Sequence, residues 1–537
     1  MEYKDFGVML CSASNGIMRV EKLKEFIDKI SLFGYNLLEL CIDDMLEVEN
    51  EPFYGYLRGR YTKKEIQEIE EYAQKKGVEI VPCIQVLAHM EHILKHPCYG
   101  EIADTGSILL VDEPKTYEFL NNVLKSVSET FSSRKINIGY DEAHSVGLGA
   151  YLSKNGYTDR YELLMRHLDK VVGIADKYGL KVHMWGDMFL RLASKKFDQD
   201  IYAEKGLVVP KEVRERVPQG VGLCYWDYGS VEEDIYDDIF RVYEGFNRDF
   251  WFAGTSWTCR GFAPMNTFST EPLMPAMKQV IKHNVEHVLI TLWGDSGNPC
   301  SYFVSLPILY AVRQFANGNF DMDSIKKGFE DIMGERYDDY LALDLPNKNK
   351  HNYDLKRVDR TSESFLYNDV FLGLMDPVIK EIAPIPFKEY KEQLIETKKR
   401  MKQYAYLFDK LIELCNVLEL KAELGVRTRD AYRAQNKELL KVIVLDYYET
   451  IERIKQFKET FRKEWMLENK VWNWNVHEMR LSGLMARIGD CARRLDEFIK
   501  GDVDSIPELE EELLSYAPYA WYPHMDYNRL AYPGSHR

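Results

Sequence analysis

Eight short apolar runs that alternate with helical patterns constrain this chain more than any other feature. Each run is nearly continuous in apolar, often β-branched residues, as expected of strands that are buried on both faces. Strand runs separated by helical patterns predict parallel strands joined by helices. The runs are Phe6–Ala13, Asn36–Asp43, Val78–Gln85, Lys135–Glu142, Leu180–Asp187, Val221–Tyr228, Asp249–Trp257 and His287–Asp295. Eight such units predict an α/β fold, a (β/α)8 TIM barrel.

The intervening helical patterns support this prediction, because several of them end at a glycine, the usual residue after the last turn of a helix. They are Arg19–Phe33, Lys63–Lys76, Arg160–Tyr178 and Val231–Glu244, which precede Gly34, Gly77, Gly179 and Gly245.

After about residue 325 the strand runs stop and long amphipathic patterns take their place. Phe387–Gly425, Thr428–Glu468 and Val476–Lys500 each carry an apolar stripe at helical spacing. They predict an α-helical domain. The expected division is therefore a barrel over residues 1–325 and a helical domain over residues 326–537. Two roles stay open for the helical half: shaping the rim of a pocket, or joining two chains as a homodimer.

Charge and composition exclude several classes of partner. The 70 basic and 86 acidic residues give a net charge of −16, which argues against nucleic acid and anionic lipid as partners. No run approaches the ~20 apolar residues of a membrane span. The start has no basic-then-apolar signal region, and the 9 cysteines form no CxxC motif. We therefore expect no membrane partner and a cytoplasmic location.

Polar and aromatic residues gather at the ends of the predicted strands. In barrels of this kind the chemistry takes place at the carboxyl ends of the strands. These ends carry Ser12–Asn15, Asp43–Asp44, Gln85 with His89, Asp141–Glu142, Trp185–Asp187, Trp226–Tyr228, Ser256–Trp257 and Trp293–Asp295. A barrel that needed polar residues only for solubility would place them on both rims, so the sequence predicts a site at this rim.

The adjacent acids Asp141 and Glu142 are the strongest candidates for catalysis. The letters DEAH also occur in helicases, but that function requires a GxxxxGK[ST] phosphate loop, which the sequence lacks. A solvated acidic turn is the simplest alternative. In a catalytic site Glu142 would be the general acid, and Asp141 would hold a substrate group such as an amide N–H. Repulsion between the two charges would raise one pKa and keep that acid protonated near neutral pH.

Tryptophans supply the other prominent signal at this rim. One tryptophan at a strand end is more often part of the core, but four together predict an aromatic cage. The four are Trp185, Trp226, Trp257 and Trp293, to which Tyr228 and Asp295 would add hydrogen bonds.

Histidines near this rim do not form a metal motif. His89, His92 and His144 lack an HExxH pattern or a Cys/His cluster, so we expect no metal. We expect His89 to hydrogen-bond to a catalytic carboxylate.

Several motifs resemble glycoside hydrolase family 20, the β-N-acetylhexosaminidases. The run NIGYDEAHSVGLGAYL contains the family's His/Asn-x-Gly-x-Asp-Glu pattern. Further similarities are Gly7–Leu10, Glu51–Thr62, Tyr225–Tyr228, Gly261–Pro264, Thr291–Asp295 and Glu468–Leu484. Together they resemble the bacterial branch that has a barrel followed by a helical domain.

The resemblance implies substrate-assisted catalysis, in which the 2-acetamido oxygen of the sugar attacks C1 and forms an oxazolinium ion. Asp141 would orient the acetamido N–H, and Glu142 would be first acid and then base. Configuration at C1 would be retained, and no cofactor would be needed. The partner would be a β-linked oligosaccharide or glycoconjugate that ends in N-acetylglucosamine or N-acetylgalactosamine.

The resemblance also implies roles for the rim aromatics. Trp185 and Trp226 would wall the acetamido pocket, and Tyr228 would donate a hydrogen bond to the acetamido oxygen. Trp293 would lie under the sugar ring, and Asp295 would reach a hydroxyl group.

Two departures from the family bear on substrate choice. Relatives usually carry Ser-Arg-Asn after the first strand, whereas this chain has Ala13-Ser14-Asn15, which leaves Asn15 as a substrate-binding candidate. Pro299 stands where relatives tend to have Glu. Both changes remove charged hydrogen bonds from the C3/C4 edge of the sugar site. We therefore expect an opened edge, suited to a substituted or extended hexosamine.

Two alternatives stay open. In a double-displacement β-glycosidase, Glu142 would be the acid and Asp187 or Asp227 the nucleophile, with no part for an acetamido group. In a non-catalytic sugar-binding protein the acid pair would have no catalytic role.

Overall fold

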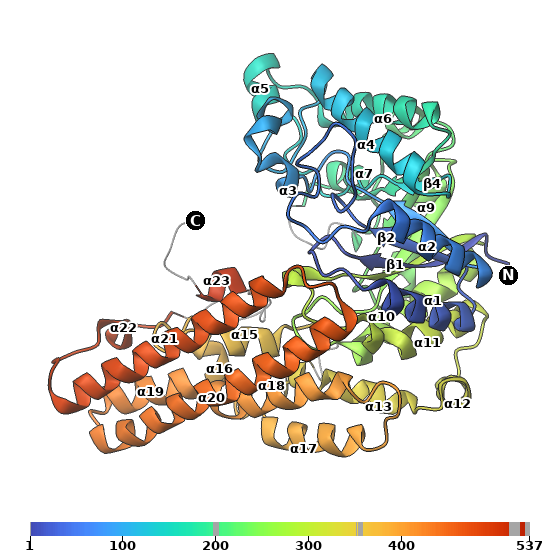
Figure 1. Cartoon of the computed structure of the whole chain (residues 1–537). Helices are drawn as coiled ribbons and strands as arrows, with labels where there is room; N and C mark the ends of the chain where they lie inside the picture. Colours follow the sequence, from blue (N-terminus) through green and yellow to red (C-terminus); the bar gives the residue numbers. More distant parts are fainter. Residues whose placement is uncertain (1, 197–202, 351, 353–357, 515–526, 532–537) are drawn as a thin grey trace. The chain divides into compact units, whose positions relative to one another are not determined.

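In the computed structural model, eight parallel strands close into a barrel in chain order. Figure 1 labels β1, β2 and β4 among them. The structure describes residues 2–196, 203–350, 352, 358–514 and 527–531. The strands are β1 Asp5–Cys11, β2 Leu37–Cys41, β3 Glu79–Cys83, β4 Lys135–Asn137, β5 Lys181–Trp185, β6 Gly222–Trp226, β7 Phe250–Thr255 and β8 His287–Leu292. The predicted TIM barrel is confirmed. The predicted runs extend past the strands at their carboxyl ends, where the chain leaves the sheet to form the rim.

The register brings these carboxyl ends to one level. Cys11 pairs with Cys41, Cys41 with Cys83, and Cys83 with Asn137 on successive strands. Apolar side chains fill the barrel at this level, among them Met9, Cys11, Cys41, Cys83, Trp185, Cys224 and Trp251. The rim residues therefore start from a tightly packed and common base.

Helices follow the strands, and local sequence signals define several of their ends. Thr62 accepts a hydrogen bond from the Glu65 N–H, and the Glu65 side chain accepts one from the Thr62 N–H, which forms a capping box at the start of α2. The helices are α1 Val20–Phe33, α2 Lys63–Lys75, α3 Glu91–Leu94, α4 Pro114–Thr130, α5 Ala150–Asn155, α6 Arg160–Lys177, α7 Asp187–Ala193, α8 Lys211–Arg216, α9 Glu233–Glu244, α10 Asn266–Lys282, α11 Leu306–Ala316 and α12 Met322–Met333. The four helices predicted from periodicity are all present.

The last third of the described chain is helical, as predicted, but two of the three long helices are broken. Its helices are α13 Tyr337–Leu341, α15 Thr361–Tyr367, α16 Asp376–Ile382, α17 Phe387–Lys398, α18 Leu407–Lys421, α19 Leu424–Arg433, α20 Lys437–Glu468, α21 Trp474–Lys500, α22 Pro507–Glu510 and α23 Tyr527–Ala531. Figure 1 shows α18, α20 and α21 as long neighbouring rods, and α20 packs against both of the others.

The two breaks have tertiary and local causes. The predicted helix Phe387–Gly425 is wrong across residues 399–406, because the carboxylate of Glu335 accepts hydrogen bonds from the backbone N–H groups of Lys402 and Gln403 at 2.7 and 2.8 Å. Glu335 itself is 4% exposed. The predicted start at Thr428 is also wrong, because Asn436 caps α20 through the Leu439 N–H.

The chain divides into two compact units. The first comprises Met1–Ser256, Ser269–Trp293 and Ile308–Ile325, and the second comprises Trp257–Phe268, Gly294–Pro307 and Lys326–Arg537. The segments that follow β7 and β8 therefore group with the helices. None of the helices in the described ranges is long and apolar enough to span a membrane.

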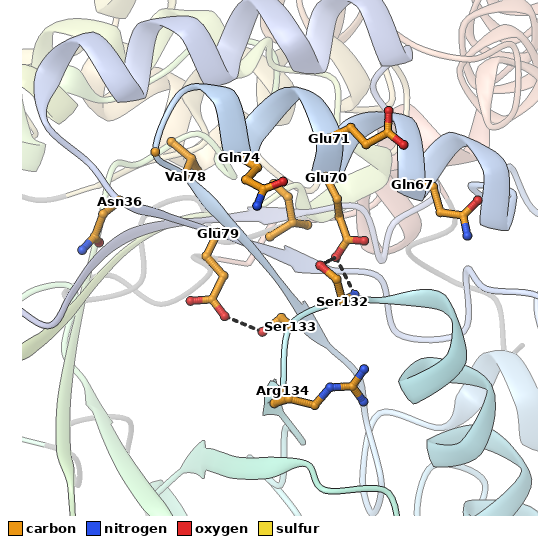
Figure 2. Close-up of a pocket in the computed structure, with 12 residues that line it drawn as sticks. Asn36, Gln67, Glu70, Glu71, Gln74, Val78, Glu79, Ser132, Ser133 and Arg134 are labelled. Carbon is orange, nitrogen blue, oxygen red and sulfur yellow. Dashed lines mark hydrogen bonds between the residues drawn. The ribbon is translucent and has the colours of Figure 1, made fainter.

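A cavity of about 1040 Å3 lies at the amino ends of β3 and β4, between α2 and the turn before β4. Figure 2 shows that its side chains bond to one another: Glu70 accepts from Ser132, and Glu79 accepts from Ser133. This end of the barrel is opposite the rim that carries the acid pair, so the cavity is separate from the candidate active site.

Candidate active site

The turn after β4 places the acid pair in a conformation that the backbone rarely adopts. Gly139, Tyr140 and Glu142 have φ of +68°, +83° and +52°. A Cβ on Gly139 would lie 2.0 Å from the Gln85 side-chain oxygen, so only glycine fits there. Positive φ also occurs at Asn15, Asp43 and His89. Backbone strain of this kind concentrates at functional sites.

The imidazole of His89 lies beside both acids. Its Nε2 is 3.3 Å from Asp141 Oδ2 and 3.6 Å from Glu142 Oε2. The two carboxylates differ in exposure: the Asp141 side chain is 13% exposed and that of Glu142 is 44% exposed. The structure thus brings together the three residues that the sequence predicts for the chemistry, with Glu142 more open to a ligand.

Charges in this group shift two pKa values in opposite directions. Burial raises the pKa of Asp141, but the charge and hydrogen bond of His89 and the Gln85 amide outweigh it and hold the pKa below its ordinary value. Burial lowers the pKa of His89, but Asp141, Glu142 and Asp43 raise it to about 10. Near neutral pH the site therefore holds an Asp141 carboxylate against a His89 imidazolium.

Buried polar residues fix the position of this group. The Gln85 amide Nε2 donates to Asp141 Oδ1 at 3.0 Å, and Asp187 Oδ2 accepts from the Glu142 N–H at 3.0 Å. Below them, Asn137 accepts from the Gly139 N–H and donates to Glu39, both at 2.9 Å. Gln85 and Asn137 lie at or just beyond strand ends, which is the one sequence signal that could have identified them as supports of the acid pair.

Two further carboxylic acids lie under the rim. Burial and the charge of Asp141 raise the pKa of Asp187 well above its ordinary value. Burial and the neighbouring Asp44 raise the pKa of Asp43 to about 7. Asp187 is 2% exposed, so it acts here as a buried support for the Glu142 backbone.

The first turn of the rim is held by an arginine that the sequence analysis did not select. Arg58 Nε pairs with Asp44 Oδ1 at 2.8 Å, with both side chains at most 8% exposed. Its Nη2 donates to the Ala13 carbonyl. Asn15 Oδ1 accepts from the Gly59 N–H at 2.9 Å. Asn15 and Arg58 thus tie the β1 turn to the segment before α2.

Three of the predicted aromatics and Tyr228 form one group in the barrel unit. Trp226 stacks on Tyr228 with ring centroids 5.2 Å apart, and Trp293 Nε1 donates to the Tyr228 hydroxyl at 3.1 Å. The Trp185 and Trp293 centroids are 6.2 Å apart. Trp185 is 1% exposed, whereas Trp226 and Trp293 are half-buried. The half-buried rings offer apolar faces of the kind that bind sugars.

Trp257 and Asp295 belong to the second unit. Trp257 stacks with the Arg260 guanidinium, 4.8 Å from the ring centroid, and Asp295 lies 3.8 Å from Arg360. Their part in a sugar site stays a prediction. In the described residues, no three His, Cys, Asp or Glu side chains group as ligands of a metal ion.

A closed parallel barrel with acids, an imidazole and indoles at the carboxyl ends of its strands has the layout of the TIM-barrel enzymes. Comparison with known families gives a more specific assignment. The model of the glycosyl hydrolase family 20 catalytic domain matches residues 6–205, and that of the glycoside hydrolase 20C C-terminal domain matches residues 338–524. The chain belongs to glycoside hydrolase family 20, which confirms the resemblance seen in the sequence.

Individual relatives match over part of their length. The beta-hexosaminidase of Vibrio furnissii is 30% identical over 214 residues, which cover 31% of this chain and 35% of that protein. Hexosaminidase D of Homo sapiens is 25% identical over 230 residues, 41% and 44% of the two chains. The chain thus spans less than half the length of either relative. The solved β-N-acetylhexosaminidase of Streptomyces coelicolor A3(2) is 20% identical with a TM-score of 0.45, over 62% of this chain and 70% of that chain.

Proposed function

We propose that the protein is a retaining exo-β-N-acetylhexosaminidase that uses the 2-acetamido group of its substrate as the nucleophile. The observation that carries the proposal is the adjacent pair Asp141 and Glu142 with His89 within 3.6 Å of both, at the carboxyl end of β4. Family membership and the two hexosaminidase relatives support the substrate class.

The electrostatics suit the two steps of this mechanism. As the acetamido oxygen attacks C1, positive charge develops on the oxazolinium ring, and the ionised Asp141 accepts a hydrogen bond from its N–H. Glu142 gives its proton to the departing oxygen. In the second step Glu142 takes a proton from water, which attacks C1 and restores the acetamido group, so configuration is retained. Charge stabilisation by preorganised groups of this kind is usually the largest catalytic contribution.

The environments of Asp187 and Asp227 argue against double displacement. Asp187 is 2% exposed and binds the Glu142 N–H. Asp227 is 7% exposed, and its oxygens accept from the Tyr225 hydroxyl at 2.8 Å and from the N–H groups of Gly229 and Ser230 at 2.9 Å. A nucleophile must approach C1 with a free lone pair, and neither carboxylate is exposed for that attack.

We further propose that the substrate is a substituted or extended hexosamine. Ser14 replaces the arginine of relatives, and Arg58 behind it is committed to Asp44 and the Ala13 carbonyl. Pro299, in place of a glutamate, is buried, and its carbonyl accepts from Lys410 at 2.6 Å. Neither position supplies a charged side chain to a sugar. We also propose a cytoplasmic location, which the lack of a disulfide at any of the nine cysteines supports.

Hydrolysis of an aryl N-acetyl-β-glucosaminide and inhibition by its thiazoline analogue test the mechanism. We expect strong inhibition, and loss of turnover in Glu142→Gln and Asp141→Asn, while the exposed Glu101→Gln serves as a matched control with full activity. A lack of inhibition by the thiazoline analogue would favour double displacement. Turnover that does not depend on Glu142 would refute the assignment of the acid, and no turnover on any β-hexosaminide would favour a binding protein.

A further inference from the structure

Three rings form a second aromatic group at the rim of the barrel. Phe53 and Tyr56 lie in the loop that follows β2, and His96 lies just after α3, in the loop that follows β3. The Phe53 ring centroid is 5.5 Å from that of Tyr56 and 4.9 Å from that of His96, and the Tyr56 and His96 centroids are 6.4 Å apart. Both loops leave the carboxyl ends of their strands, so these three rings, the aromatic platform, lie at the same end of the barrel as the acid pair.

The aromatic platform is exposed although its rings are largely apolar. Phe53 is 38% exposed and Tyr56 is 47% exposed, and the next residue in the chain, Leu57, is 67% exposed. The proposed mechanism gives them no role. Apolar side chains that gather on a surface mark a site of interaction, and binding functions concentrate on loops that a rigid scaffold positions.

Buried contacts hold the loop after β2 against the barrel. The side chain of Tyr54, between the two exposed rings in the sequence, is 2% exposed, and its hydroxyl donates to the Asp43 carbonyl at 2.6 Å. The Glu51 carboxylate accepts from the Tyr99 hydroxyl at 2.9 Å and from the Asn122 amide at 2.8 Å. The exposed rings are therefore preorganised, which lowers the entropy cost of binding a ligand.

The aromatic platform flanks the acid pair on the side of His89. Tyr54, His89 and Ile93 line one small cavity of the barrel unit. Phe53 precedes Tyr54 in the chain, and the His96 N–H donates to the Ile93 carbonyl at 3.0 Å. His89 in turn lies within 3.6 Å of both acids. A ligand that extends from the acid pair past His89 therefore meets these rings.

The polar groups of the aromatic platform fit a sugar better than a purely apolar ligand. Neither the Tyr56 hydroxyl nor the His96 imidazole hydrogen-bonds to any residue that the structure describes. A pyranose has an apolar C–H face and hydroxyl groups around its edge, so it can stack on an aromatic ring and hydrogen-bond to a polar group beside that ring.

We propose that the aromatic platform binds the sugar to which the terminal hexosamine is β-linked, on the leaving-group side of the scissile bond. Glu142 gives its proton to the departing oxygen, so the sugar that carries this oxygen lies beside Glu142 and its neighbour His89. Tyr56 and Phe53 stack on this sugar, and His96 and the Tyr56 hydroxyl bond to its hydroxyl groups. The orientation of the substrate rests on the proposed function.

Calorimetric binding to the full-length protein tests this proposal without turnover. The probes are N-acetylglucosamine and sulfur-linked disaccharides in which it is β-linked to position 3, 4 or 6 of a second hexose, because a thioglycosidic bond resists hydrolysis. We expect at least one disaccharide to bind about tenfold more tightly than the monosaccharide.

Two variants remove the flat rings and keep apolar side chains in their place. Tyr56→Leu and Phe53→Leu should each lower the affinity for that disaccharide by about 2- to 12-fold and leave the affinity for the monosaccharide unchanged. Tyr157→Leu, at a tyrosine of the barrel unit that is 70% exposed, is the matched control and should leave both affinities unchanged.

Three outcomes would overturn the proposal: equal affinity of the wild type for the monosaccharide and every disaccharide, an advantage of the disaccharide that survives both substitutions, or an equal loss of both affinities in the two variants. The third outcome would make the rings only supports of the loop beside His89. Binding of the monosaccharide without a gain from the second sugar would refute the aromatic platform alone, whereas a lack of binding by every sugar would also refute the proposed function.

Discussion

The variant Gln85→Leu tests the hydrogen bond that supports Asp141 and leaves both members of the acid pair unchanged. Gln85 is 7% exposed; its Nε2 donates to Asp141 Oδ1 at 3.0 Å, and its Oε1 is 3.4 Å from the Tyr140 N–H. Leucine has a similar size and makes neither bond. A hydrogen bond to a charged group contributes about 1.5–3 kcal/mol, and if the transition state depends on it the loss corresponds to about 10- to 150-fold in kcat/KM.

The direction of the pH effect makes this prediction specific. The Gln85 amide lowers the pKa of Asp141, so its removal should raise that pKa and move the acid limb of the kcat/KM profile to higher pH. The assay is hydrolysis of an aryl N-acetyl-β-glucosaminide across pH, beside Gln67→Leu, a control at an exposed glutamine of α2. An unchanged acid limb with unchanged kcat/KM would refute the reasoning.

Three further predictions concern neighbouring groups and the helical unit. His89→Asn should destabilise the fold in a pH-dependent way. The pKa of His89, raised from 6.5 to about 10, contributes stability that is full below pH 6.5 and is lost as pH rises through about 10. The Tm difference between variant and wild type should therefore shrink over that range, and a constant difference would contradict the ion pair. Asp187→Asn keeps an oxygen for the Glu142 N–H and should retain kcat/KM within about tenfold, whereas complete loss would favour Asp187 as a nucleophile. Glu335→Ala should lower the free energy of unfolding by about 2–4 kcal/mol, because the N–H groups of Lys402 and Gln403 lose a buried acceptor. Denaturant titration measures this loss, with Glu101→Ala as the control. A Glu335→Ala variant as stable as the wild type would show that water replaces the carboxylate.

The hydrophobic pattern of a segment predicts its secondary structure when the segment's own residues determine which of its faces are buried. The barrel strands are continuous apolar runs because both faces are buried, so all eight were identifiable. Their carboxyl ends were not, because apolar residues such as Ile42, Ile84 and Ile138 continue the pattern for a residue after the backbone has left the sheet. β4 shows this most clearly: it ends at Asn137, and Gly139 turns the chain away by its positive φ.

In the helical half, the sequence prediction failed because of a residue outside the predicted helix. The stripe from Phe387 to Gly425 is continuous, yet the helix breaks where Glu335, more than sixty residues earlier in the sequence, accepts the backbone N–H groups of Lys402 and Gln403. A capping group that is remote in sequence leaves no local signal. Asn436 is different, because an N-cap residue before a helix is a local signal.

For the site, the sequence by itself determined which residues are the candidates for the proposed chemistry: the acid pair, His89 and the rim aromatics, through residue type and position after a strand. Only the tertiary structure decided their electrostatic state and support. The pKa of Asp141 depends on distances to His89 and Gln85, which come from other parts of the chain. Coulomb and hydrogen-bond energies fall steeply with distance, and such distances are set when the strands close into a barrel.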